Sequence, residues 1–329
     1  MALHIEPATA PSRPARSVDQ LQIGLVNNMP DAALEATALQ FAQLLAAASD
    51  GLQISLRLTS IPEVPRSGGA LEHIRLHYWP LEQIFAQPPD ALIVTGTEPI
   101  ASSLTDEPYW ASFVALLKWA QHNTLSSLWS CLAAHAAVQA LDGVRRQRLE
   151  NKRFGVFEHR RSLEHELTRG LPAIVPMPHS RWNDLPLAQL QATGYQVLSR
   201  GERTGADLFV KDSVSLLIFV QGHPEYESTT LLKEFRRDVG RYLRGEYADY
   251  PLLPHGYFKA AAVERLRRFE AQARAQRNPT LMETFPPIVA EEIEATWQPC
   301  AVRLYHNWLL HLSTLRQSSE GSIRKGYNG

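Results

Sequence analysis

Two short runs that end in reactive side chains place the strongest constraint on how this sequence can fold. The first covers residues 124–130 and leads directly into Cys131, and the second covers residues 214–220 and leads into Gly-His-Pro-Glu at 222–225. Runs of this length and composition indicate buried strands. Because the carboxyl ends of parallel strands meet at one edge of a sheet, we expect Cys131 and His223 to lie close together there.

The rest of the chain alternates between predicted strands and helices, which favours a mostly parallel sheet wrapped by helices. Strands are expected at 21–26, 52–58 and 90–95, and helices at 31–47, 109–122, 132–141, 229–244 and 261–277. Asp31 is expected to cap the first of these helices. Three further segments indicate strands of an antiparallel portion, namely 154–158, 194–199 and 207–210.

Changes in composition along the chain predict four regions. Residues 1–18 are rich in Pro, Ala, Ser and Arg and indicate a flexible arm, while residues 19–250 form the main α/β domain. Residues 251–317 are interpreted as a C-terminal helical extension that packs on the same domain. Residues 318–329 are expected to be a disordered tail.

The balance of charges and the cysteine count exclude several classes of protein. With 33 basic and 34 acidic residues and no Lys/Arg stripe, a generic nucleic-acid binder is disfavoured. No apolar stretch approaches the roughly 18 residues that span a bilayer, and the start of the chain lacks a secretion-signal pattern, so the cytoplasm is the expected compartment. The cysteines Cys131 and Cys300 lie far apart, which favours free thiols over a disulfide or a Cys-rich metal site. We identify no metal motif and no nucleotide-phosphate loop.

Cys131 has the features of a nucleophile because a helix is expected to begin directly after it. The positive end of a helix dipole stabilises a thiolate, and the first N–H groups of the helix, at Leu132 and its neighbour, could stabilise an oxyanion. A lone cysteine is more often a small buried hydrophobic residue. The strand-turn-helix context and the downstream histidine segment favour the nucleophile.

His223 and Glu225 complete a predicted catalytic triad. Glu225 is two residues after His223 and can reach back to the far ring nitrogen, which would fix the tautomer and stabilise the imidazolium. A solvated surface glutamate is the alternative for Glu225. The Thr95-Gly96-Thr97 turn after another strand could supply a second oxyanion donor, although an ordinary tight turn explains it equally well. These patterns predict thiol-dependent acyl transfer.

The chain resembles the homoserine O-succinyltransferases, a homoserine O-acyltransferase family within the class I glutamine-amidotransferase-like superfamily. The resemblance runs from about Leu21 to Arg244 and resumes near residues 307–309. It rests on a set of ordered motifs: Asn27-x-Met29-Pro30, Leu92-Ile-Val-Thr-Gly96, Asp106-x-x-Tyr109-Trp110, Lys152-x-x-Gly155-Val-Phe-Glu158-His159, Pro178-His179-Ser180-Arg181, Gly222-His-Pro-Glu-Tyr226 and Glu234-Phe-Arg-Arg237-Asp238.

The resemblance implies a flavodoxin-like, doubly wound, mostly parallel sheet and a ping-pong acyl transfer in methionine biosynthesis. Cys131 would take the acyl group from acyl-CoA, a cosubstrate rather than a permanently bound cofactor, and His223 would act as base. Lys152, Ser180 and Arg237 fall on the family's substrate-binding positions. The resemblance also implies a homodimer.

One further substrate contact follows from spacing alone. Glu234 lies one helical turn before Arg237 and could receive the substrate ammonium group.

Several positions depart from the family pattern. Leu132 replaces an aromatic residue, His135 replaces Gln, and Trp129 stands where a glutaminase needs Gly, which disfavours glutamine hydrolysis. Acyl preference in the family is associated with a Gly or Glu shortly after the Thr-Gly turn. Here Thr97 begins a Thr-Glu-Pro-Ile-Ala segment in which Ile100 is the nearest equivalent.

Three hypotheses remain at this point. The first is succinylation of L-homoserine from succinyl-CoA. The second is the same chemistry with acetyl-CoA, on homoserine or on serine. The third is a non-catalytic amidotransferase-like binding module, and the intact residues Cys131, His223 and Glu225 argue against it.

Overall fold

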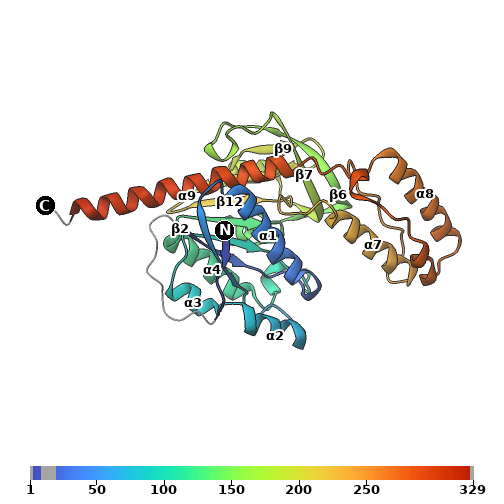
Figure 1. Cartoon of the computed structure of the whole chain (residues 1–329), viewed down its shortest axis with the longest axis horizontal. Coiled ribbons are helices and arrows are strands. Elements are labelled where there is room, and N and C mark those ends of the chain that lie inside the picture. Colours follow the sequence, from blue (N-terminus) through green and yellow to red (C-terminus); the bar gives the residue numbers. More distant parts are fainter. Residues whose placement is uncertain (1–2, 9–19, 327–329) are drawn as a thin grey trace.

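An eight-stranded sheet forms the centre of the protein (Figure 1). The computed structural model describes residues 3–8 and 20–326, with side chains up to residue 318. The strand order is β1-β3-β2-β4-β5-β12-β11-β8, and all neighbouring pairs from β1 to β12 are parallel. The strands span Leu3–Ile5 (β1), Gln53–Thr59 (β3), Gln20–Val26 (β2), Ala91–Thr95 (β4), Ser126–Ser130 (β5), Leu216–Val220 (β12), Leu208–Asp212 (β11) and Gln196–Val197 (β8).

Both faces of this sheet are covered, because alternate residues of each strand point to opposite sides. In β4, Ile93 belongs to one apolar cluster, which contains residues of α1, α7, α8 and α9. Leu92 and Val94 belong to a second cluster, which contains residues of α3, α4 and α5. The helices span Leu34–Ala48 (α1), Gly68–His77 (α2), Leu81–Ala86 (α3), Trp110–Asn123 (α4), Leu132–Asp142 (α5), Leu187–Ala192 (α6), Thr230–Leu243 (α7), Ala260–Ala275 (α8) and Gln298–Gly326 (α9). The predicted doubly wound α/β architecture is confirmed.

A second sheet of four antiparallel strands stands beside the first, in the order β10-β9-β6-β7. These strands span Gly205–Ala206 (β10), Ser199–Gly201 (β9), Gln147–Arg161 (β6) and Ile174–Asp184 (β7). The strand predicted at 194–199 is divided between the two sheets, because β8 pairs with β11 and β9 pairs with β6. The strand predicted at 207–210 is β11, and it joins the central sheet by pairing with β12 in antiparallel orientation.

The helix that follows β2 begins differently from the prediction. Asp31 lies in a short 3-10 turn, Asp31–Ala33, and neither this turn nor α1 has a side-chain cap. The Asp31 carboxylate instead accepts a hydrogen bond from the Ser67 amide at 2.7 Å. The predicted cap is therefore wrong, since the carboxylate fixes the start of α2 rather than that of α1.

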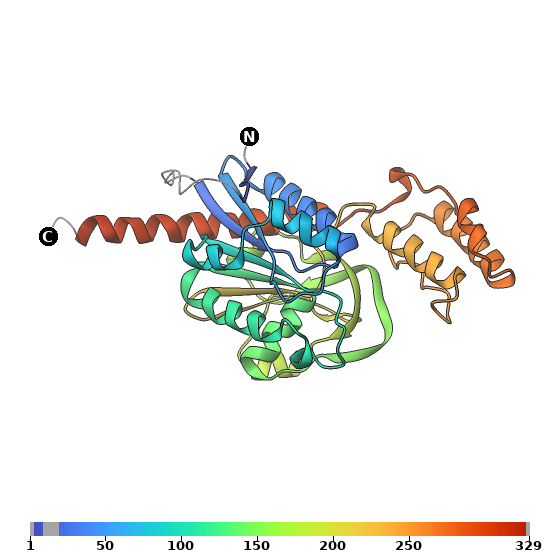
Figure 2. The same cartoon turned by 90° about the horizontal axis from the view of Figure 1, so that it is seen from below.

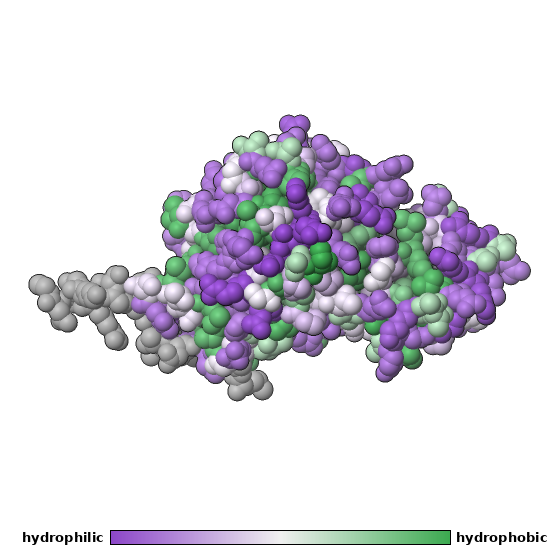
Figure 3. All heavy atoms as spheres, turned by 90° about the horizontal axis from the view of Figure 1, so that it is seen from above, coloured by the Kyte–Doolittle hydropathy of each residue, from purple (hydrophilic) through white to green (hydrophobic). Residues whose placement is uncertain are grey.

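The C-terminal third adds a helical lobe and one long helix. α7 and α8 form the lobe at the right of Figure 1, and α9 runs back across the body, so that its far end projects on the opposite side in Figure 2. On the face in Figure 3, hydrophobic residues are visible where the lobe joins the body.

The two ends of the chain differ from the sequence prediction. α9 continues to Gly326, through most of the segment predicted as a disordered tail, and 327–329 lie outside the described residues. Within the predicted N-terminal arm, β1 pairs with the edge strand β3, and residues 1–2 and 9–19 are outside the description. No helix in the described ranges is long and apolar enough to cross a membrane.

Candidate active site

Cys131 occupies a sharp turn between β5 and α5. Its backbone has φ 50° and ψ −109°, and only one other non-glycine residue with described geometry, Asp50, has a positive φ. A conformation of this kind costs roughly 1–3 kcal/mol and persists only when the surrounding structure imposes it. The Cys131 amide donates to the Val220 carbonyl at 2.7 Å, which holds the turn against the end of β12. The turn resembles the strained strand-to-helix elbow that presents nucleophiles in other α/β enzymes.

His223 lies beside Cys131 and has the predicted contact with Glu225. The ring Nδ1 of His223 is 2.8 Å from Oε1 of Glu225, and both side chains are buried. Burial by itself would lower the pKa of His223, but the charges of Cys131 and Glu225 and a hydrogen bond to each raise that pKa well above its usual value. The arrangement therefore favours the imidazolium form of His223, which lies beside the Cys131 sulfur and the Glu225 carboxylate.

The loop that carries His223 is fixed by its neighbours. The His223 amide donates to the Pro178 carbonyl at 2.8 Å, and the Gly222 amide donates to Oδ1 of Asp207 at 2.9 Å. The ring of Tyr226 stacks on the His223 ring, with centroids 4.3 Å apart. These contacts hold the imidazole in one orientation.

The predicted oxyanion site lies where the β4 turn meets the start of α5. A Cβ on Gly96 would lie 2.4 Å from Cβ of Leu132 and 3.0 Å from the Ala133 nitrogen, so only glycine fits there. The first amide of α5 that bonds back along the helix is that of His135, to the Cys131 carbonyl. The Leu132 and Ala133 amides precede it and lack intrahelical acceptors. The structure thus brings Leu132 and the Thr97 turn next to the nucleophile.

Ile100, the predicted acyl-preference position, is 71% exposed at the far end of that loop. Its exposed side chain shows no packing that would define an acyl pocket. The role assigned to Ile100 stays a prediction.

The four predicted substrate-binding residues lie together with two residues that were not predicted. We name this group the α7 cluster: Lys152, Ser180, Glu234 and Arg237, with Tyr226 and Asp238. Glu234 is its centre, because its carboxylate accepts hydrogen bonds from the Ser180 hydroxyl at 2.5 Å and from the Tyr226 hydroxyl at 2.6 Å. The Lys152 ammonium is 3.7 Å from that carboxylate. Since Tyr226 also stacks on His223, the cluster is connected directly to the proposed base.

Arg237 and Asp238 complete the α7 cluster on its outer side. Asp238 is 3.3 Å from the Lys152 ammonium and 2.8 Å from the Arg237 guanidinium. The side chain of Arg237 is half exposed and can still receive a ligand. The cluster has two positive and two negative side chains, so its net charge is zero. Such a site can pair with both charges of an amino acid zwitterion. Tyr226 and Asp238 had no predicted role, although both stand inside the quoted motifs.

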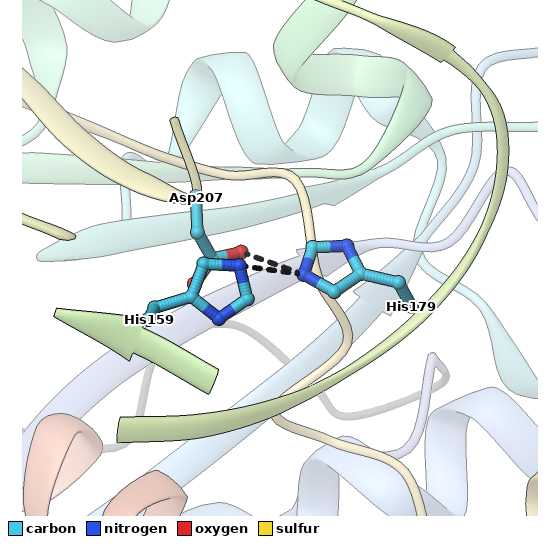
Figure 4. Close-up of side chains that lie close together, drawn as sticks. All are labelled: His159, His179 and Asp207. Atoms are coloured by element: carbon cyan, nitrogen blue, oxygen red, sulfur yellow. Dashed lines mark hydrogen bonds and ion pairs between the residues drawn. The ribbon is translucent and has the colours of Figure 1, made fainter. Parts of the chain in front are cut away.

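Behind the His223 loop lies a buried group of His159, His179 and Asp207 (Figure 4). Their potential ligand atoms lie within 4.8 Å of one another, and this is the one such group found among the described residues. The Nε2 atoms of the two histidines are 3.2 Å apart, and Nε2 of His179 is 3.5 Å from Oδ1 of Asp207. The spacing alone would suit a metal ion.

The hydrogen bonds around His179 disfavour that interpretation. Arg181 donates its Nε–H to Nδ1 of His179 at 3.1 Å, so a neutral ring must carry its proton on Nε2, which faces the other two residues. A nitrogen that carries a proton has no lone pair for a metal. Burial, together with Arg181, holds the pKa of His179 well below its usual value, so the ring stays neutral. We interpret the group as a support for the His223 loop, through Asp207 and Gly222.

Two departures from the family pattern lie near the nucleophile. His135 is buried, and its Nε2 is 2.7 Å from Oε1 of Gln221, the residue that follows β12. Burial lowers the pKa of His135 to about 3, so this histidine is neutral and cannot act as an acid near neutral pH. Trp129 is fully buried and packs edge-on against Phe113, with centroids 5.4 Å apart. Both residues have structural roles.

Cys300 and two surface hollows lie away from this site. Cys300 is buried with Leu171 and Val175, and burial raises the pKa of its thiol. Two hollows of about 660 and 510 Å³ contain none of the predicted site residues.

Comparison with known proteins decides the family. The family model described as homoserine O-succinyltransferase matches residues 4–318. The chain belongs to the homoserine O-succinyltransferase family.

Relatives named homoserine O-succinyltransferase agree over most of the chain. One from Methylorubrum extorquens is 45% identical and covers 89% of this chain and 88% of its own length. One from Bradyrhizobium japonicum is 42% identical, and the match covers 93% of this chain and 95% of the relative's length. A crystal structure of a glutamine amido transferase from Methylobacillus flagellatus covers 90% of this chain and 96% of its own, with 17% identity and a TM-score of 0.51. The last similarity shows that this homoserine O-succinyltransferase family member has the amidotransferase-like fold.

Proposed function

We propose that this protein transfers a succinyl group from succinyl-CoA to the hydroxyl of L-homoserine through a thioester on Cys131. Succinylation of homoserine follows from the family to which the chain belongs. The observation that supports the thioester route is the contact of His223 with both Cys131 and Glu225 at the edge of the sheet.

In the first half-reaction, the Cys131 thiolate attacks the thioester carbonyl of succinyl-CoA. The negative charge that develops on the oxygen is stabilised by the free N–H groups at the start of α5 and at the Thr97 turn. The carbon–sulfur bond to CoA breaks, and the His223 imidazolium gives its proton to the departing CoA thiolate. Cys131 then carries the acyl group and His223 is neutral.

In the second half-reaction, homoserine binds in the α7 cluster. Arg237 receives the α-carboxylate, and Glu234 receives the ammonium group. Neutral His223 removes the proton of the hydroxyl as the oxygen attacks the acyl-enzyme, and Glu225 stabilises the imidazolium that forms. The carbon–sulfur bond to Cys131 breaks, and the thiolate–imidazolium pair is restored.

The same proposal covers the cofactor, the compartment and the assembly. The chemistry needs acyl-CoA as cosubstrate and no permanently bound cofactor. A reactive free thiol suits the reducing cytoplasm. A homodimer is proposed from the family resemblance, and light scattering of the purified protein measures it.

The test is CoA release with L-homoserine and either succinyl-CoA or acetyl-CoA, for the wild type and for Cys131→Ala. We expect turnover with succinyl-CoA and a loss of at least about 10³-fold in the variant, since the nucleophile is removed. Mass spectrometry of the wild type incubated with succinyl-CoA alone should show one added succinyl group. Turnover with acetyl-CoA only, or with serine in place of homoserine, would contradict the proposed substrates. An active Cys131→Ala variant would exclude the thioester.

A further inference from the structure

Arg146 is a partly buried cation near Cys131 that has no partner among the described residues. No hydrogen bond or ion pair joins its guanidinium to a described side chain or carbonyl. It lies close enough to interact electrostatically with Cys131, Glu107 and Tyr109. Burial lowers the pKa of the Arg146 guanidinium, and the electrostatic interactions with Tyr109, Glu107 and Cys131 offset only part of this effect.

Two neighbours of Arg146 are buried polar groups with unmet hydrogen-bonding capacity. Within the described ranges, the hydroxyl of Tyr109 and Oε2 of Glu107 have no hydrogen-bond partner, although the residues are only 5% and 4% exposed. Buried polar groups without partners are rare in folded proteins, and each calls for an explanation. Burial raises the pKa of Tyr109, and so does the negative charge of Glu107, so the phenol stays protonated and can donate.

This group is joined to the loop between the Gly96 turn and α4. Oε1 of Glu107 accepts a hydrogen bond from the Ala101 amide at 2.8 Å, which ties the loop that begins at Thr97 to the neighbours of Arg146. The loop packs through Gly96 against the start of α5, where the acyl group must sit. The loop thus connects the start of α5, beside Cys131, with the residues that interact electrostatically with Arg146.

We propose that Arg146, with the Tyr109 hydroxyl, binds the terminal carboxylate of the succinyl group and so selects succinyl-CoA over acetyl-CoA. The inference rests on the proposed function and adds a subsite to it. A guanidinium and a phenol are both donors, and a carboxylate can accept from both. Acetyl-CoA has no carboxylate at this place and would leave both donors unpaired. Glu107 acts through the loop, as the residue that positions Ala101.

The experiment compares Arg146→Gln with the matched control Arg145→Gln, which removes the same charge from the exposed neighbouring residue. We expect Arg146→Gln to lower kcat/KM for succinyl-CoA by about 10- to 150-fold, because a hydrogen-bonded charge pair is lost. The kcat/KM for acetyl-CoA and the KM for homoserine should change by less than about threefold. Arg145→Gln should behave as the wild type, Arg146→Lys should recover part of the loss, and Tyr109→Phe should give a smaller loss confined to succinyl-CoA.

The first half-reaction gives the decisive readout. Acylation of Cys131 is followed by mass spectrometry after mixing with each donor, and thermal denaturation shows whether each variant is folded. An equal loss of acylation with both donors would overturn the inference, as would an unchanged rate with succinyl-CoA. The two failures are distinguishable. Absence of CoA release from succinyl-CoA by the wild type would overturn the proposed function, whereas an active wild type with an unaffected Arg146→Gln variant would overturn only the Arg146 subsite.

Discussion

The two sides of Cys131 differ in how completely their polar groups are paired. On one side, the carboxylate of Glu234 is already bonded to Ser180 and Tyr226, and each charge of the α7 cluster has a counter-charge within 4.0 Å. On the other side, the guanidinium of Arg146 and the hydroxyl of Tyr109 have no hydrogen-bond partner in the part of the chain that the structure describes. The polar groups of the first side are paired with one another, whereas those of the second side still have donors available for a ligand.

Under the proposed ping-pong route, this difference would let one centre serve two substrates. In the proposed acceptor site, internal pairing of charges leaves no free charge to block a small zwitterion. In the proposed donor site, unpaired donors would favour a substrate that carries a carboxylate. Changes that affect the shared centre, one side or neither side should therefore have different kinetic signatures.

The largest effect is expected from Glu225→Gln, which alters the shared centre. The amide keeps the shape of the carboxylate but loses its charge, so the imidazolium of His223 is less stable and its pKa falls. We expect kcat to drop by about 10²- to 10⁴-fold for both half-reactions. The upper limb of the pH profile for acylation of Cys131 should also move to lower pH, because this step uses the imidazolium of His223 as an acid. A loss confined to one half-reaction would show that the two sides do not share this base.

A smaller and one-sided effect is expected from Glu234→Gln. The neutral side chain can still accept from Ser180, but it no longer attracts an ammonium group. The KM for homoserine should rise by about 10- to 100-fold, whereas acylation of Cys131 by succinyl-CoA should be unchanged. Glu227→Gln, an acid outside the cluster, serves as the control. Slower acylation in Glu234→Gln would break the proposed division between the two sides.

The smallest effect on catalysis is expected from His135→Gln, which should alter neither the α7 cluster nor the group around Arg146. The buried His135 has its pKa lowered to about 3, against 6.5 for an unperturbed histidine. Between these values the unfolded chain binds a proton that the folded protein does not, so stability is lost as pH falls from 6.5 toward 3. As pH falls through this window, the free energy of unfolding of the variant should decrease by about 1.4 kcal/mol less per pH unit than that of the wild type. Urea denaturation at several pH values measures the slope, and an unchanged slope would contradict the neutral form of His135.

The sequence was sufficient to predict the central architecture and the grouping of Cys131, His223 and Glu225 at one edge of the sheet. The strands that end at Val26, Thr95, Ser130 and Val220 are short apolar runs, and the parallel order of such runs requires their carboxyl ends to converge. The spacing of His223 and Glu225 was equally informative, because the contact is local and needs no long-range information. These predictions depended on periodicity and on neighbours in the chain.

The missed features depend on contacts between distant segments. The division of 196–201 between two sheets is set by partners at β11 and β6, which a propensity pattern cannot indicate. Asp31 was predicted as a cap because its sequence position suits one, yet Ser67 competes for the carboxylate from another loop. Arg146 follows α5 in the chain and carries no motif, so only folding reveals its proximity to Cys131. A single charged residue between two elements gives no sequence pattern that indicates which distant residues it will lie near.

The hydrogen bond from the Cys131 amide to Val220 has a consequence for the newly made chain. The thiol leaves the ribosome some 90 residues before its base, and the hairpin of β6 and β7 is made in between. Until β12 is synthesised and inserted beside β5, the cysteine lacks both the carbonyl that holds its turn and the histidine proposed as its base. The proposed nucleophile and base therefore meet only after β12, the last strand of the central sheet in chain order, has been made.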